Sequence, residues 1–167
     1  MAGGTAHAGA QQMNEREAKV AYLFNFAKFV EWPADTLPQA SAISFCIIGD
    51  GSLASELSTA VRGREIAGHK VTVSELKADA PLSACHLLYI TGLDQKRLDR
   101  LLAATATMPL FTVSDMDRFA KQGGVASLIF DGGRMRFSIN INTAQHAHLA
   151  ISSRLLALAT IIKDEAR

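Results

Sequence analysis

The chain has 167 residues, of which 49% are hydrophobic and 20% charged, and its formal net charge is +1. This length predicts one domain whose core is large enough to fold without disulfides. Acidic and basic side chains are interspersed and no apolar run reaches membrane-spanning length, which argues against a nucleic-acid-binding protein and against a membrane-spanning one.

The N-terminal segment is rich in alanine and glycine and has no apolar periodicity. We therefore expect residues 1–13 to be disordered and a single domain to span residues 14–167. The tripeptide Ala6-His7-Ala8 resembles the small-residue end of a secretory signal, but the basic and apolar parts of such a signal are missing. Two readings stay open: the chain begins near the mature end of an exported protein, or the segment is a flexible tail.

The first predicted helix begins at Asn14, an N-cap residue followed by acidic residues, and ends at about Val30, before Trp32-Pro33. Aromatic side chains crowd this helix, and they fill cores as well as protein interfaces, so both roles stay open. The candidates for contact with a protein partner are Tyr22, Phe26, Phe29 and Trp32.

Strands and helices then alternate along the chain. We predict strands over residues 43–48, 71–73, 86–90 and 109–113, helices over 52–62 and 94–104, and a short helix over 115–119 capped by Ser114. This alternation predicts an α/β fold: a compact, Rossmann-like single domain with a mostly parallel sheet flanked by helices. In such sheets the first strand commonly lies between the second and the third.

The pattern changes after residue 124. Residues 125–130 and 134–140 predict an antiparallel hairpin around the glycine-containing turn at 131–133, which would add edge strands to the sheet. Two helices, over residues 143–148 and 151–162, are expected to close the chain.

Cys46 and Cys85 are the only two cysteines, and each lies in or beside a predicted buried strand. If those strands are neighbours, the two side chains can come within disulfide range. A disulfide would place the protein outside the reducing cytosol. The alternative is a pair of free, buried cysteines that act as small apolar side chains.

The turn Gly49-Asp50-Gly51 follows a strand and precedes a helix, and Glu75 stands where a ribose-binding acid would lie. Either this turn binds the phosphates of a nucleotide or it is a tight turn that needs glycine. We find no catalytic motif and no metal-ligand spacing. His146 and His148 are two residues apart and so point to different faces of a helix, and Asp115 and Asp117 suit a helix N-terminus. The sequence therefore predicts no enzyme, no cofactor and no metal.

Several segments together resemble the YfiR-like (DUF4154) family. The strongest is Lys19 to Pro33, with its aromatic helix and Trp-Pro ending. The others are the cysteine-bearing strands at 45–50 and 85–90 and the C-terminal segments at 136–140 and 151–156. The family's pair of cysteines that can form a disulfide matches Cys46 and Cys85, whereas a second pair described for that family has no counterpart here.

The resemblance implies a non-enzymatic, periplasmic protein of a Gram-negative bacterium. It implies that the protein represses an inner-membrane diguanylate cyclase by contact with its periplasmic region, and that an OmpA-like outer-membrane lipoprotein relieves this repression. The output would be the cyclic-di-GMP level and biofilm formation, and the protein would be a homodimer. Two alternatives stay open: a small nucleotide-binding enzyme that uses the Gly49-Asp50-Gly51 turn, and a periplasmic sensor of a small molecule.

Overall fold

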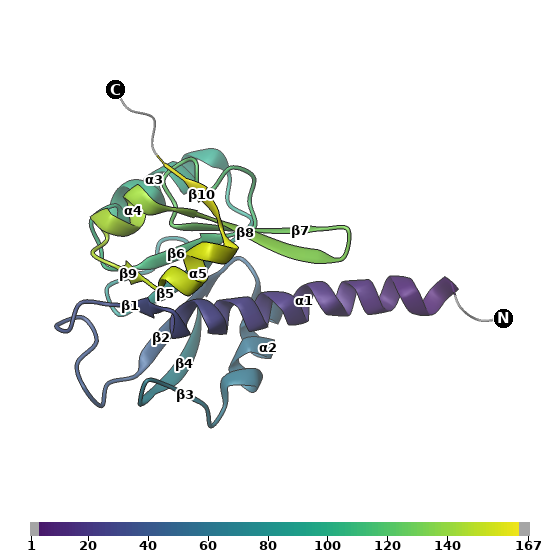
Figure 1. Cartoon of the computed structure of the whole chain (residues 1–167), viewed down its shortest axis with the longest axis horizontal. Coiled ribbons are helices and arrows are strands. Elements are labelled where there is room, and N and C mark those ends of the chain that lie inside the picture. The colour runs from purple at the N-terminus through teal and green to yellow at the C-terminus, as the bar shows by residue number, and fades with distance from the viewer. Residues whose placement is uncertain (1–3, 164–167) are drawn as a thin grey trace.

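Helices and strands alternate along residues 4–163, the residues that the computed structural model describes (Figure 1). The helices are α1 (Gly4–Lys28), α2 (Gly51–Val61), α3 (Gln95–Thr105), α4 (Ile141–His146) and α5 (Ser153–Leu158). The strands are β1 (Val30–Glu31), β2 (Ile43–Ile48), β3 (Glu65–Ile66), β4 (His69–Leu76), β5 (Leu87–Ile90), β6 (Phe111–Ser114), β7 (Ala126–Asp131), β8 (Arg134–Asn140), β9 (Ala150–Ile151) and β10 (Thr160–Ile162).

The central sheet has the strand order β10-β8-β7-β6-β5-β2-β4-β3. Strands β4, β2, β5, β6 and β7 run parallel, whereas β8 pairs antiparallel with β7. Every residue of β5 and β6 is buried, as expected for strands that are covered on both faces. The predicted α/β class, the mostly parallel sheet and the C-terminal hairpin are confirmed. The first long strand, β2, lies between the next two long strands, β4 and β5, as predicted.

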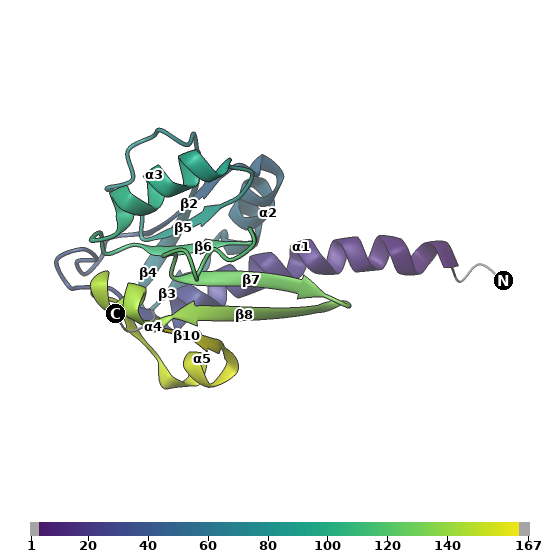
Figure 2. The same cartoon turned by 90° about the horizontal axis from the view of Figure 1, so that it is seen from above.

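Two hydrophobic clusters fill the two faces of this sheet. Alternate residues of β2 belong to different clusters: Phe45 and Ile47 pack with α1 and α2, whereas Cys46 and Ile48 pack with α3. Figure 2 shows α3 and α5 on opposite sides of the sheet. The domain is therefore a three-layer structure with the sheet in the middle.

Helix α1 lies across the sheet, and its amino-terminal half extends beyond the body of the domain beside the β7–β8 hairpin (Figures 1 and 2). Its backbone is helical from Gly4, whereas we expected disorder over residues 1–13 and a start at Asn14. Alanine-rich sequence has a high helix propensity, and extending a helix costs far less free energy than nucleating one, which accounts for the earlier start. Residues 1–3 lie outside the described part of the chain.

The C-terminal region differs from the predicted helix over residues 151–162. A short helix, α5, is capped by Ser152 and ends at Leu158, and β10 then pairs parallel with β8. Threonine and isoleucine are β-branched, so residues 160–162 favour a strand over a helix. As a result β10, and not the hairpin, forms this edge of the sheet.

The predicted short helix over residues 115–119 is a turn. Ser114 is the last residue of β6, and its hydroxyl oxygen accepts a hydrogen bond from the Met116 amide at 3.0 Å. This side-chain bond stabilises a turn as readily as a helix N-terminus, so the sequence signal was ambiguous.

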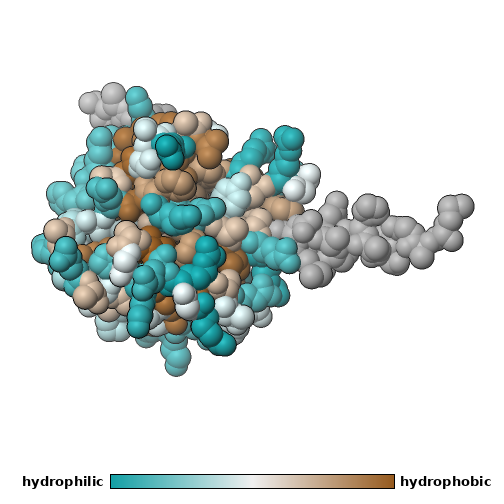
Figure 3. Space-filling view, turned by 60° about the horizontal axis from the view of Figure 1, so that its bottom comes forward, coloured by the Kyte–Doolittle hydropathy of each residue, from teal (hydrophilic) through white to brown (hydrophobic). Residues whose placement is uncertain are grey.

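The surface has mixed polarity. On the face shown in Figure 3, hydrophilic side chains surround smaller apolar areas. Among the described residues, the large hydrophobic side chains that are exposed are those of Ile129, Leu158 and Ile161. Within residues 4–163, no helix is both long enough and apolar enough to cross a membrane.

Candidate functional site

Cys46 and Cys85 form a disulfide between two neighbouring parallel strands. Cys46 lies in β2, Cys85 lies two residues before β5, and their Cα atoms are 5.9 Å apart. Both residues are buried in the cluster that packs against α3. The sequence left open whether the two cysteines are bonded or free, and in the structure they are bonded.

Trp32 and His86 hold the segment that follows α1 and β1. The Trp32 indole N–H donates a hydrogen bond to the backbone oxygen of His86 at 2.9 Å. The His86 ring accepts a bond from the Ser44 amide at Nδ1 (2.9 Å), and its Nε2 lies 3.0 Å from the backbone oxygen of Thr36. Because Nδ1 accepts, Nε2 carries the proton and donates to Thr36. The Trp-Pro ending of the helix is thus tied into the core beside the disulfide.

The aromatic side chains predicted to contact a partner lie at different depths. Phe26 is 1% exposed and Trp32 is 8% exposed, so both belong to the core of the monomer. Tyr22 and Phe29 are half-buried, and the Tyr22 hydroxyl donates to the backbone oxygen of Met135 at 3.2 Å. Only Tyr22 and Phe29 therefore have surface to offer in this conformation, and their contact with a partner stays a prediction.

The Gly49-Asp50-Gly51 turn connects β2 to α2. Gly49 has φ = +94°, and a Cβ atom there would overlap the backbone oxygen of Thr91. Asp50 caps α2 by accepting a hydrogen bond from the Leu53 amide at 3.0 Å, and the Glu75 carboxylate lies against Gly51. Two carboxylates at this helix N-terminus repel a pyrophosphate, so the geometry favours a turn that needs glycine over a nucleotide site.

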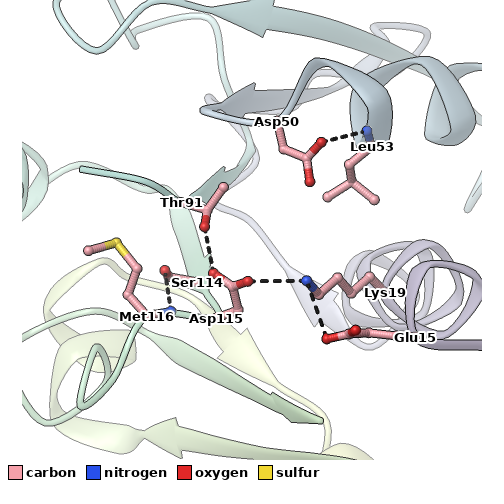
Figure 4. Close-up of polar contacts among 8 residues, drawn as sticks. All are labelled: Glu15, Lys19, Asp50, Leu53, Thr91, Ser114, Asp115 and Met116. Atoms are coloured by element: carbon pink, nitrogen blue, oxygen red, sulfur yellow. Dashed lines mark hydrogen bonds and ion pairs between the residues drawn. The ribbon is translucent and has the colours of Figure 1, made fainter. Parts of the chain in front are cut away.

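Polar side chains gather at the carboxyl edge of the sheet, where successive strands end (Figure 4). The Thr91 hydroxyl, after β5, donates to Asp115 Oδ1 at 2.7 Å. Lys19 of α1 reaches Asp115 Oδ2 at 3.1 Å and lies 3.9 Å from Glu15. The chain passes from β2 to β4 on one side and then to β5 on the other, so this is the point at which doubly wound sheets bind ligands. Here α1 and its lysine cover that position.

The charges of this cluster stabilise one another. Burial by itself would raise the pKa of Asp115, but the Thr91 hydroxyl and the Lys19 ammonium outweigh it and hold that pKa below its usual value. Tyr89 lies beneath and is fully buried, and its hydroxyl interacts with the Asp115 carboxylate and the Thr91 hydroxyl. Burial, and then the negative charge of Asp115, raises the pKa of Tyr89, which keeps the phenol protonated.

From the sequence, Asp115 is expected at a helix N-terminus, and its partners Lys19 and Thr91 are not predicted. The sequence does hold a pattern from which this cluster could be predicted. Asp50, Thr91 and Asp115 each follow a predicted parallel strand, and the carboxyl ends of parallel strands meet at the same edge of the sheet. Lys19 carried no signal of its own, because it is 96 residues from Asp115. Within residues 4–163, no group of three or more His, Cys, Asp or Glu side chains could hold a metal ion.

Comparisons with known proteins agree with this fold. A crystal structure of a conserved domain protein from Vibrio cholerae O1 biovar eltor str. N16961 is similar, with a TM-score of 0.53 and 17% sequence identity, over 78% of this chain and 57% of that chain. At this identity the likeness concerns the fold alone. No curated protein matches the chain. The family model described as DUF4154, YfiR/HmsC-like, matches residues 16–160. The chain therefore belongs to the YfiR/HmsC-like family, whose members are regulatory, non-enzymatic and periplasmic.

Proposed function

We propose that this chain is a periplasmic binding protein that represses an inner-membrane diguanylate cyclase by contact with its periplasmic region. The observation that carries the proposal is the family match over residues 16–160, which spans nearly the whole described domain. The Cys46–Cys85 disulfide supports it, because such bonds persist in oxidising compartments such as the periplasm.

The physical basis of the repression would be a shift of population. A cyclase that exchanges between active and inactive states is inhibited when the repressor binds the inactive state more tightly. A tenfold preference corresponds to about 1.4 kcal/mol of differential binding free energy, so moderate contacts suffice. An OmpA-like outer-membrane lipoprotein would relieve the repression by competing for the domain. A homodimer is part of the same proposal.

The test is the intracellular cyclic-di-GMP level. The chain is exported to the periplasm of a Gram-negative host by a cleavable signal, together with each membrane-bound diguanylate cyclase of a panel that carries a periplasmic region. We expect cyclic-di-GMP, measured by mass spectrometry, to fall severalfold with a cognate cyclase. Co-production of the competing lipoprotein is expected to restore it.

Two controls locate the effect. The same chain without the signal stays in the cytoplasm and is expected to leave cyclic-di-GMP unchanged. A cyclase whose periplasmic region has been deleted is expected not to respond. If no cyclase of the panel responds to the exported chain, or if the cytoplasmic form represses equally well, the proposal is wrong.

A further inference from the structure

A groove lies beside α3. Figure 2 shows this helix on the other side of the strands β5 to β8 from α5. The second wall of the groove is the segment between β4 and β5, and the cavity between these walls has a volume of about 740 Å³. The residues that line it are Lys77, Ala78, Asp79, Ala80, Pro81, Leu82, Arg97, Arg100, Leu101, Ala104 and Met108. This volume falls within the range of specific binding sites.

The floor of the groove is apolar. Leu101 and Ala104 are three residues apart and share one side of α3, and Met108 lies in the bend that follows the helix. Leu101 is 5% exposed, and Met108 and Leu82 are half-buried against the same hydrophobic cluster. This apolar floor is therefore continuous with the core, and Ala104 is its exposed part.

One end of the groove is positively charged. Arg97 and Arg100 lie in the amino-terminal half of α3, Lys77 lines the other wall, and Asp79 is the one acidic residue among those that line the groove. The Arg97 guanidinium is 3.8 Å from Asp94, but both side chains are 65% exposed, so this ion pair is weak. The groove is thus basic at one end and apolar at the other.

The second wall is held in place before any partner arrives. The Ala80 amide donates to the Lys77 oxygen, and the Cys85 amide donates to the Leu82 oxygen, each at 3.0 Å. Cys85 is in turn bound covalently to β2 through the disulfide. A wall that is already ordered lowers the conformational-entropy cost of binding.

We propose that this groove binds an amphipathic helix of the regulated protein, with an apolar stripe that packs on Leu101, Ala104 and Met108 and acidic residues that face Lys77, Arg97 and Arg100. An apolar floor with one charged end selects a ligand of matching polarity, as in other helix-in-groove complexes. The inference rests on the proposed function, in which the domain acts through contact with a protein.

The first test uses a fluorescent synthetic helical peptide of about fifteen residues, with leucines at i, i+3, i+4 and i+7 and glutamates in one terminal turn. We expect saturable binding by fluorescence anisotropy that weakens with added salt. A peptide with lysines in place of the glutamates, and one with the leucine stripe scrambled, are expected to bind at least about tenfold more weakly. Equal binding of all three peptides would overturn the proposal.

Matched pairs of variants test whether the peptide binds in the groove. The R97E/R100E variant reverses two charges of the basic end, and K121E/R134E makes the same charge change on exposed residues elsewhere. Ala104→Trp fills the apolar end, whereas Ala103→Trp adds the same side chain to an exposed neighbour outside the groove. We expect R97E/R100E and A104W to weaken binding about tenfold and both controls to bind like the wild type. Equal effects within each pair would contradict the proposal. Melting temperatures verify that all four variants are folded.

The repression assay separates this inference from the proposed function. If the wild type represses a cyclase and R97E/R100E represses it equally well, the groove is not the contact surface although the function stands. If no cyclase is repressed but the peptide binds as expected, the proposed function fails and the groove remains a helix-binding site. If decanoate displaces the peptide and binds with the same sensitivity to A104W, the groove takes an anionic amphiphile and the inference is wrong.

Discussion

At the scale of single residues, Gly49 is fixed both by its backbone angle and by its neighbour. Residues other than glycine rarely adopt its φ of +94°, and a Cβ atom would overlap the backbone oxygen of Thr91. We expect Gly49→Ala to lower the free energy of unfolding by about 3 kcal/mol or more, because β2 and β5 would have to move apart. Urea unfolding measures the change.

Gly63→Ala is the matched control. Gly63 also has a positive φ, +75°, but a Cβ atom there meets no atom within 4 Å. The expected loss is therefore only the left-handed backbone cost, about 1 kcal/mol. Equal losses for the two variants would show that contact with Thr91 does not matter.

Asp115 makes the stability of the domain depend on pH. Its pKa is lower in the folded protein than in the unfolded chain, where it is about 3.9. Its contribution is therefore complete above that value and is lost as the pH falls through the folded pKa. We expect Asp115→Asn to cost about 1 kcal/mol at neutral pH, since the ion pair with Lys19 is partly exposed, and the difference from the wild type to shrink below about pH 4. Urea unfolding at several pH values measures this, and a difference that grows in acid would contradict it.

At the scale of elements, Asn140 joins β8, α4 and the turn after β6. It is fully buried, its side-chain N–H donates to the Ala120 oxygen at 2.8 Å, and its side-chain oxygen caps α4 by accepting from the Thr143 amide at 3.1 Å. We expect Asn140→Ala to cost about 2 kcal/mol, because the cap is lost and the buried oxygen of Ala120 keeps only its longer hydrogen bond, from the Gly123 amide at 3.4 Å. Thermal unfolding measures the loss.

Ser152→Ala provides the comparison for Asn140. Ser152 caps a helix of the same length, α5, but its side chain accepts only from the Arg154 amide. The expected cost is that of a cap alone, about 1 kcal/mol. If S152A destabilised the domain as much as N140A, the hydrogen bond between Asn140 and Ala120 would contribute nothing to the free energy of unfolding.

At the scale of the whole molecule, the disulfide is the one covalent constraint between distant segments of the described chain. It links residues 39 positions apart. We expect the double variant C46S/C85S to unfold with a free energy lower by about 4 kcal/mol in the chain-entropy model. Urea unfolding with and without reductant measures this. Reductant should destabilise the wild type and leave the variant unchanged, and an unchanged midpoint in the variant would refute the prediction.

Most strands of the sheet could be predicted from local patterns in the sequence. Buried apolar runs, glycine turns and helix caps such as Asp50 and Asp94 are local, and they predicted β2, β5, β6, the hairpin, α2 and α3 within a few residues. They failed where local preference is balanced, as at Ser114, whose side-chain bond suits a turn and a helix alike. They also failed at the end of the predicted C-terminal helix, where residues 160–162, which are β-branched, form a strand that pairs with β8.

The sequence by itself determined the fold class and the family, because these depend on patterns that are read within short segments. The order of the strands β4, β2 and β5 was expected only because that order is common in doubly wound sheets. Only the tertiary structure decided that Cys46 and Cys85 are bonded, that Phe26 and Trp32 are core residues, and that Lys19 lies against Asp115. It also brought Lys77 and Arg100 to the same groove beside α3. The physical reason is that each of these contacts joins segments far apart in the chain, and the packing of the layers, which no local pattern encodes, sets their distance.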